Sequence, residues 1–402
     1  MAVVTRLVGD LDVAEDAVQD ACTAALVQWP ASGVPAAPRA WLISVARHKA
    51  LDVIRREARR AGKEAAAVTE AAPPGAPSAT DRLPADDQLS PDDQLALVLM
   101  CCHPALALPA RTALTLRAVC GLSTAQIASV FLVPEATMAQ RLVRAKRKIR
   151  QAGIAMTMPS PAELPGRLAA VLRVIYLVFT EGHLASSGPD LIRGEACEQA
   201  IRLARELVRL APGQPEAAGL LALLLLTDAR RAARVSPAGE LVQLADQDRS
   251  RWDAARIAEG RDLVAGALAA RRPGPYQLQA AIAACHCDAP SAETTDWRQI
   301  VALYDALLIV EPTPVAAANR AAAVAMADGP AAGLAIMTRL AAEPALAGWA
   351  PLHIAKAQLH GQLGDTDRAL AGYQLALQLG GSDAQREFIR SRLRDLSSPQ
   401  AD

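Results

Sequence analysis

Apolar residues recur at helical spacing over most of the chain, and the clearest case is residues 122–150. Ser123 and Gln126 have the spacing of a capping box at the start of a helix. Pro134 suits the first position of a second helix, where no backbone donor is needed. This second helix has one apolar stripe, spaced by four, three and four residues: Met138, Leu142, Ala145 and Ile149. The pattern predicts a helix-turn-helix that turns at residues 132–133.

The stripe leaves polar and basic residues on the other faces of the second predicted helix. Six basic residues and no acidic one lie between Arg141 and Arg150. Cations can hold DNA phosphates, while Thr, Gln and Arg side chains can reach base edges in a major groove. We therefore expect contacts with duplex DNA from Thr137, Gln140, Arg141, Arg144, Arg147 and Lys148. The alternative is a solvated basic helix on an unrelated helical domain.

Two more amphipathic helices are predicted near the N-terminus, over Val13–Trp29 and Arg39–Arg60, separated by a Pro/Gly-rich loop. Asp16 and Asp20 lie four residues apart on the first helix, so both carboxylates face the same way. Residues 39–63 hold eight basic and two acidic residues, which favours phosphate contacts. The net charge of the whole chain is zero, so it does not reveal that the first of these helices is acidic and the second is basic.

From Ala162 onward the sequence favours helices almost continuously. One pattern, with offsets of four, three and five residues, occurs three times: Ala200, Ala204, Leu207 and Pro212; Ile300, Tyr304, Leu307 and Pro312; and Ala369, Tyr373, Ala376 and Gly381. It resembles the second helix of a tetratricopeptide repeat (TPR), whose period is about 34 residues. Gly364 stands where such a repeat turns.

Composition fits this helical reading. The 402 residues are 52% hydrophobic and 3% aromatic, and that mixture favours helices over a large sheet. Glu64–Pro91 is rich in Ala, Pro, Asp and Ser without apolar periodicity, so we expect a flexible linker. We expect no signal peptide, because Met1–Asp20 is acidic and lacks an apolar core, and the longest apolar run, Gly219–Leu226, is too short to span a bilayer. We expect a cytoplasmic protein without a membrane partner.

Neither a metal site nor an enzyme is indicated. Cys101-Cys102-His103 and Cys285-His286-Cys287 lack CxxC spacing, and adjacent residues on a helix cannot all reach one ion. We expect the seven scattered cysteines to be reduced thiols, and no cofactor. A polar set in the third block could form inter-helix salt bridges or line a peptide groove, with catalysis as a weaker alternative: Glu181, His183, Arg230, Arg231, Arg234, Asp248 and Arg249.

Several segments together resemble a bacterial sigma factor of the extracytoplasmic-function (ECF) type. AEDAVQDA at Ala14–Ala21 is similar to that family's helix for binding RNA polymerase. Trp41-Leu42 with Ala46-Arg47, Asp52 and Arg55-Arg56 is similar to its promoter-melting helix, and Leu122–Arg150 to its upstream-element reader. The third block looks like the extension of one ECF subgroup with a TPR-like tail, through four segments: Asp228–Val235, Asp246–Asp253, Gly274–Ala284 and Thr295–Trp297.

This resemblance implies core RNA polymerase and promoter DNA as partners, and it permits a protein ligand for the tail. It assigns polymerase binding to Asp16, Gln19 and Asp20. It assigns the downstream promoter element to Trp41, Arg47, His48, Arg55 and Arg56, and the upstream element to the six residues named above. On residue type alone, the two aspartates also fit a solvated face, and Trp41 also fits a core position.

We therefore predict an all-α chain in five parts. These are a sigma region 2-like domain, short at its N-terminus (1–62), a flexible linker (63–91), a sigma region 4-like helix-turn-helix (92–155), a helical extension (160–290) and TPR-like repeats (291–396). The predicted function is promoter recognition under control of the tail. The alternative is an operator-binding regulator with a TPR-like protein-binding domain. Two departures from the family pattern are Leu132, at a turn position often filled by Gly, and His48, where Asn is common.

Overall fold

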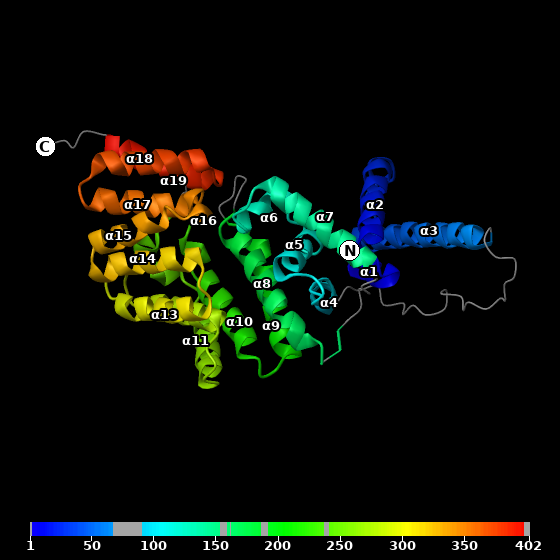
Figure 1. Cartoon of the computed structure of the whole chain (residues 1–402), viewed down its shortest axis with the longest axis horizontal. Helices are drawn as coiled ribbons and strands as arrows, with labels where there is room; N and C mark the ends of the chain where they lie inside the picture. Colours follow the sequence, from blue (N-terminus) through cyan, green and yellow to red (C-terminus); the bar gives the residue numbers. More distant parts are fainter. Residues whose placement is uncertain are drawn as a thin grey trace. The chain divides into compact units, whose positions relative to one another are not determined.

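The computed structural model of the chain consists of helices joined by loops (Figure 1). It describes residues 2–66, 91–152, 159–160, 162–185, 192–236 and 241–397. Within those ranges no β-strand forms, apart from an isolated antiparallel bridge between Val235 and Leu241. None of the helices described is long and apolar enough to cross a membrane. The prediction of an all-α fold is confirmed.

The α-helices follow one another through the described residues. The first eight are α1 (Ala2–Val8), α2 (Leu11–Ser32), α3 (Pro38–Ala66), α4 (Pro91–Cys101), α5 (Leu108–Ala118), α6 (Thr124–Val130), α7 (Glu135–Gln151) and α8 (Leu164–His183). Next come α9 (Gly194–Leu210), α10 (Pro215–Asp228), the 3-10 turns η1 (Arg231–Ala233), η2 (Leu244–Asp246) and η3 (Arg249–Arg251), α11 (Ala254–Ala269) and α12 (Pro275–Asp288). The last are α13 (Trp297–Val310), α14 (Pro314–Asp328), α15 (Pro330–Leu340), α16 (Pro344–Ala347), α17 (Ala350–Gln362), α18 (Thr366–Leu379) and α19 (Asp383–Ser397).

The chain divides into two compact units. The first contains Met1–Ser123 and Ala139–Val171, and the second contains Thr124–Met138 and Leu172–Asp402. The helix-turn-helix is shared between them, because α6 and the start of α7 belong to the second unit and the rest of α7 to the first.

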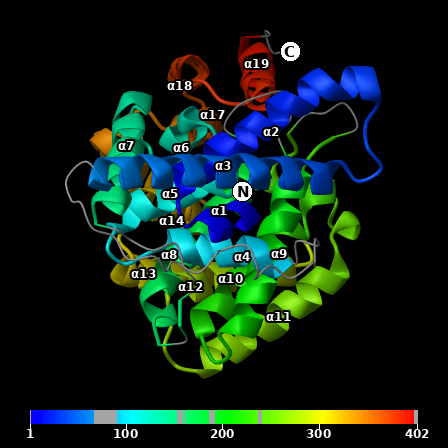
Figure 2. The same cartoon turned by 90° about the vertical axis from the view of Figure 1, so that its right-hand side faces the viewer.

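In the first unit, α1, α2 and α3 pack around a stripe of small residues. Asp10 begins α2 by accepting hydrogen bonds from the backbone N–H groups of Asp12 and Val13, at 2.8 and 3.1 Å. Figure 2 shows α3 along its full length. The buried core of the three helices is built from Val4, Ala14, Ala17, Ala21, Ala46 and Ala50. Small residues let the helices approach closely and leave the polar faces of α2 and α3 outward.

The helix α2 continues through Pro30 to Ser32, so the predicted break at Trp29 comes three residues too early. Proline lacks the N–H that would bond to the carbonyl four residues before it. In the last turn this removes one bond without breaking the helix. Gly33, with φ of 81°, then ends α2, and its N–H donates to the Trp29 carbonyl at 2.9 Å.

The predicted linker, residues 63–91, lies for the most part outside the described residues. The helix α3 extends to Ala66, and α4 begins at Pro91. Residues 67–90 between them are not described.

The first unit also joins α4, α5 and the beginning of α8. Arg167 of α8 is buried, and its guanidinium donates to the carbonyls of Leu99 and Met100 at 2.8 and 3.5 Å. Carbonyls in the last turn of a helix lack partners within it, so a cation is favourable there. Cys102, next to this contact, is fully buried, and burial raises the pKa of its thiol to about 12. The thiol is therefore protonated at neutral pH.

In the second unit, α10 is the central helix of the extension. Residues 219–226 form its apolar run, and all of them are buried. The helices α9, α11 and α12 pack against α10. A helix that is apolar on every side is stable in water only when neighbours cover it all round. The run that was too short to span a membrane is therefore a core helix of the extension.

The remaining helices of the second unit pack in consecutive layers. Figure 1 shows α13, α14, α15, α17 and α18 stacked one on the next. Gly364 adopts a positive φ of 78° in the turn between α17 and α18, a conformation that glycine takes without strain. The repeated pattern marks core positions, since eight of its residues are buried: Ala200, Ala204, Leu207, Ile300, Leu307, Ala369, Tyr373 and Ala376.

Candidate nucleic-acid interface

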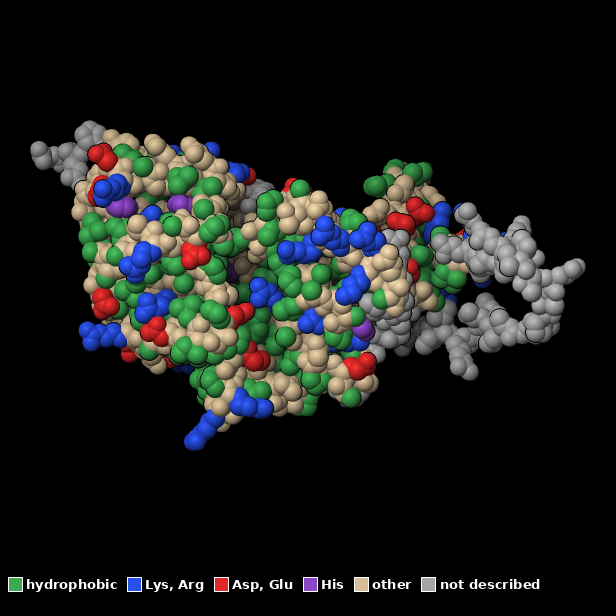
Figure 3. Space-filling view, in the orientation of Figure 1, with side chains coloured by type: hydrophobic (Ala, Val, Ile, Leu, Met, Phe, Trp, Pro, Cys, Tyr) green, Lys and Arg blue, Asp and Glu red, His purple; other side chains and the backbone are tan. Residues whose placement is uncertain are grey.

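The apolar stripe of α7 is buried, as its spacing predicted. Met138, Leu142 and Ala145 are buried, and Ile149 is half-buried. The opposite faces of the helix carry the polar residues: Thr137, Gln140, Arg144, Arg147 and Lys148 are exposed, and Arg141 is half-buried. Lys and Arg side chains gather on the surface over α7 (Figure 3). The apolar face of α7 thus packs against the protein, and the opposite face presents cations to solvent.

The turn before α7 sets the direction of that helix. Leu132 adopts a left-handed conformation, with φ of 51°, although glycine is the residue that takes it without strain. Its N–H donates to the Ser129 carbonyl at 3.1 Å, and the N–H of Val133 donates to the Ala128 carbonyl at 3.0 Å. Pro134 directly precedes the first residue of α7. This tight turn requires the conformation that Leu132 adopts.

Lys146 departs from the cationic surface of α7. Its ammonium group lies 2.8 Å from Asp12 Oδ1 and 2.8 Å from Glu15 Oε2, both on α2. Burial disfavours the charge, but the hydrogen bonds to the two carboxylates outweigh it and raise the pKa of Lys146. Sequence reasoning grouped Lys146 with the other cations, because its partners lie more than 130 residues away along the chain.

The helix α3 presents a second basic surface. His48, Arg55 and Arg56 are exposed, and Arg47 is half-buried. Arg55 lies 3.9 Å from Asp52, in a solvent-exposed pair that contributes little stability. The Nδ1 atom of His48 donates to the Ser44 carbonyl at 2.7 Å, which leaves Nε2 as the ring nitrogen free of this contact.

Trp41 lies at the beginning of α3 and contacts Trp29 near the end of α2. Their ring centroids are 5.5 Å apart at an interplanar angle of 60°, which is an edge-to-face pair. Trp41 is half-buried, so it packs on one side and is open to solvent on the other. The pair joins the end of α2 to the start of the basic helix α3, on either side of the loop at residues 33–37.

The predicted polymerase-binding residues lie on the solvent face of α2. Asp16, Gln19 and Asp20 are exposed, opposite the stripe that contains Ala17 and Ala21. The structure thus brings the two carboxylates onto one accessible face.

Sequence reasoning missed an exposed apolar patch near the end of α2. Leu26, Val27 and Val34 are 78%, 72% and 64% exposed. The sequence did contain a sign of this patch: Leu26 and Val27 do not fall on the buried stripe of α2, which ends with Ala25. Apolar residues out of phase with a buried stripe are candidates for a binding surface.

The described residues contain no group of three or more His, Cys, Asp or Glu side chains that could hold a metal ion. Cys101 and Cys102 are buried, whereas Cys285 and Cys287 are half-buried.

Three parts of the chain match known families. Residues 1–60 match sigma-70 region 2, and residues 87–149 match sigma-70 region 4. Residues 167–268 match a family of unknown function, DUF6596. The chain is also 41% identical over 401 residues to an uncharacterised protein of Rhizobium meliloti (strain 1021), in an alignment that covers 100% of this chain and 94% of the relative. The chain therefore belongs to the sigma-70 family of sigma factors, which bind core RNA polymerase and promoter DNA, and it carries a DUF6596 domain after region 4.

Proposed function

We propose that the chain is an ECF-type sigma factor whose helical extension regulates promoter recognition. The observation that carries the proposal is the division of exposed residues among three helices. Cations cover α7 and α3, whereas Asp16 and Asp20 share the open face of α2. Duplex DNA, separated DNA strands and a basic groove on polymerase require those three kinds of surface.

In this proposal α7 lies in the major groove of the upstream promoter element. Thr137 and Gln140 are near its N-terminal end, where a recognition helix reaches base edges. Arg144, Arg147 and Lys148 follow and hold phosphates.

The helix α3 engages the downstream element. Arg47, Arg55 and Arg56 bind the backbone of the strands, and the open side of Trp41 stacks on an unpaired base. The ring of His48 contributes a hydrogen bond through Nε2.

Asp16, Gln19 and Asp20 contact core polymerase. The test is in vitro transcription with core polymerase on promoters of the chain's own genome. Asp16→Asn with Asp20→Asn should lower the affinity for core polymerase and the output together, while Asp262→Asn, an exposed position on α11, serves as the matched control. A chain that never displaces another sigma factor from core polymerase would instead be an operator-binding regulator.

Regulation by the extension is supported by a contact within the second unit. The Gln126 amide of α6 donates to the Glu181 carboxylate of α8 at 3.2 Å. A change in the extension that moves Glu181 would therefore act on the first helix of the helix-turn-helix. Gln126→Ala in the full chain should change transcription output without changing the affinity for core polymerase, and unchanged output would oppose this route.

In this proposal a protein ligand of the TPR-like helices inserts a side chain into a cavity of about 290 Å³, which is lined by α17, α18 and α19 together with Gln243. Polar and aromatic side chains reach it, including Gln358, Tyr373 and Arg392. Arg392→Ala should weaken capture of such a ligand by the full chain, and transcription output measured with this variant would report whether the ligand activates or inhibits.

A further inference from the structure

We propose that three arginines of the extension, Arg230, Arg234 and Arg249, form a binding site for a small oxyanion, the phosphate or carboxylate group of a soluble molecule. These residues are called the arginine cluster below. The proposal does not depend on the sigma-factor function, because its test measures binding and stability alone.

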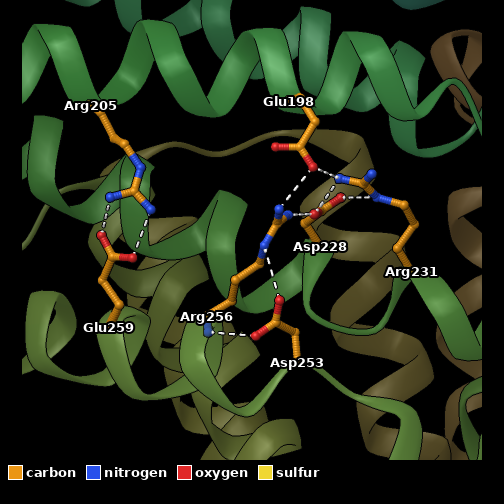
Figure 4. A network of polar contacts seen from close by, with 7 residues as sticks. All are labelled: Glu198, Arg205, Asp228, Arg231, Asp253, Arg256 and Glu259. Carbon is orange, nitrogen blue, oxygen red and sulfur yellow. Dashed lines mark hydrogen bonds and ion pairs between the residues drawn. The ribbon is translucent and has the colours of Figure 1, made fainter.

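The arginines near this cluster have carboxylate partners. Arg231 and Arg256 share Asp228 and Glu198, with Arg231 at 2.5 and 2.7 Å from the two acids (Figure 4). Arg205 makes a bidentate pair with Glu259 at 2.6 and 2.7 Å in the same view. Arg205, Arg231 and Arg256 are therefore each neutralised by at least one carboxylate of the same unit.

The arginine cluster has a different set of contacts. Arg234 donates to the His183 carbonyl, and Arg249 donates to the carbonyls of His286 and Ala289 at 2.6 and 2.7 Å. The guanidinium carbons of Arg230 and Arg249 lie 6.0 and 4.5 Å from the centroid of the Trp252 ring. In the described part of the chain, none of the three arginines makes an ion pair with a carboxylate. The carboxylate that acts on Arg249 is the exposed Glu293.

Unpartnered polar atoms lie at the same place. Arg249 Nη2, His183 Nδ1 and His286 Nδ1 are buried and have no hydrogen-bond partner among the described residues. Arg234 and Trp252 are buried, and Arg230, Arg249 and His286 are half-buried. A buried donor without a hydrogen-bond partner destabilises the fold, and more so when it is charged.

Arg230 and Arg249 lie close together, because both guanidinium groups lie against the Trp252 ring, and the charge of Arg230 acts on Arg234. Burial, and then Arg230, lower the pKa of Arg234 to about 10. Burial, and then Arg230 and Arg249, lower the pKa of His286 to about 4. Like charges gathered under partial burial are unfavourable unless an anion joins them. The planar guanidinium fork matches the oxygens of a carboxylate or phosphate, so an oxyanion completes the site.

The sequence signal is the pair of segments DARRAARV and DQDRSRWD, in which acidic and basic residues alternate. The structure separates their roles. Asp228, Arg231 and Asp253 belong to the ion-pair network, whereas Arg230, Arg234 and Arg249 form the cluster.

The test uses the full chain in phosphate-free buffer at neutral pH, with chloride added to hold ionic strength constant. Inorganic phosphate and acetate are titrated separately, which distinguishes the two sources of oxyanion. We expect one of them to raise Tm by a few degrees, by the linkage of ligand binding to folding. Isothermal titration calorimetry on the same samples gives the affinity. A Tm that is unchanged by both anions overturns the proposal.

Arg249→Gln should weaken the anion affinity about tenfold or more, since it removes one charge-assisted contact. Arg205→Gln, whose arginine is paired with Glu259, is the matched control and should respond as the unmodified chain does. Arg230→Gln is the second cluster variant, with circular dichroism to show that each variant is folded. Equal anion affinity in Arg249→Gln, Arg230→Gln and the unmodified chain overturns the proposal.

A further experiment tests whether a carboxylate of the chain itself occupies the arginine cluster. Glu240 is close in sequence to Arg234 and Arg249, and Asp190 is close in sequence to His183; both carboxylates lie outside the described residues. A response to anions that appears only after Asp190→Asn with Glu240→Gln would mean that the chain supplies its own counter-charge, and it would overturn the proposal of an external ligand.

Discussion

Gln126 and Glu181 are joined by a hydrogen bond of 3.2 Å between the first helix of the helix-turn-helix and α8. The same Glu181 oxygen accepts a second bond from Arg193 at 3.0 Å, and the carboxylate is almost completely buried. One buried acid therefore connects α6 to the extension on one side and to the approach to α9 on the other.

Glu181→Ala should lower the free energy of unfolding by about 2–3 kcal/mol, because two donors lose a shared charged partner. Gln126→Ala should cost about 1 kcal/mol, and the double variant should be less destabilised than the sum of the two. Urea unfolding of the four chains measures this coupling. Arg202→Ala, at an exposed position of α9, is the control. Strict additivity would show that the bond contributes nothing.

Asp228→Asn should destabilise the chain by about 3–5 kcal/mol, because it removes the buried carboxylate between Arg231 and Arg256 and leaves the two guanidinium groups to share the more exposed Glu198. Glu259→Gln removes a pair that is more than a third exposed and should cost about 1 kcal/mol or less. Thermal unfolding of both variants gives the comparison. Equal losses would contradict the role of burial.

Leu132→Gly should stabilise the chain by a few tenths up to about 1 kcal/mol. The left-handed backbone at Leu132 costs about 1 kcal/mol or more for a side chain with a Cβ, and this outweighs the entropy that glycine loses. Val143→Gly, at an exposed position inside α7, should instead destabilise by a few tenths of a kcal/mol, roughly the difference in helix propensity between Val and Gly. The measurement is Tm at fixed protein concentration. If Leu132→Gly lowers Tm, the backbone at Leu132 is not strained in the way proposed.

Stability should fall as pH decreases from 6.5 toward 4. The pKa of His286 is lowered from 6.5 to about 4, by burial first and then by Arg230 and Arg249, and the pKa of His183 is lowered as well. A histidine with a lowered folded-state pKa contributes stability above its unfolded pKa, and that stability is lost on acidification. Urea unfolding against pH tests the sign, and His286→Asn should flatten the curve by up to about 1 kcal/mol per pH unit.

Arg144→Ala should weaken binding to promoter duplex and reduce the salt slope by about one ion, because Arg144 is an exposed cation on α7. Lys146→Ala is the matched control on the same helix. Since Lys146 pairs with Asp12 and Glu15, it should leave the slope nearly unchanged. Fluorescence anisotropy over a range of salt concentrations compares the two. Equal slopes in both variants would argue against phosphate contact by this surface.

Local periodicity was enough to predict the all-α fold and the buried stripe of α7, because 3.6-residue spacing determines which side of a helix is apolar. The stripe at Met138, Leu142 and Ala145 and the core positions of the extension follow this rule. The end of α2 was wrong by three residues, because a proline in a last helical turn removes only one bond.

Contacts between distant segments could not be predicted in the same way. Lys146 reads as one more cation on α7 until the fold brings Asp12 and Glu15 to it. Gln126 reads as a capping residue, and nothing in its neighbourhood indicates Glu181, which lies 55 residues away. The assignment of individual residues to polymerase and DNA remains a prediction from the resemblance.

The burial of α10 on every side has a practical consequence for dissecting the chain. A fragment cut between residues 192 and 288 would remove α9, α11 or α12 and expose consecutive leucines to water. Such a fragment should aggregate, so affinity tags, fusion junctions and protease sites belong outside this stretch.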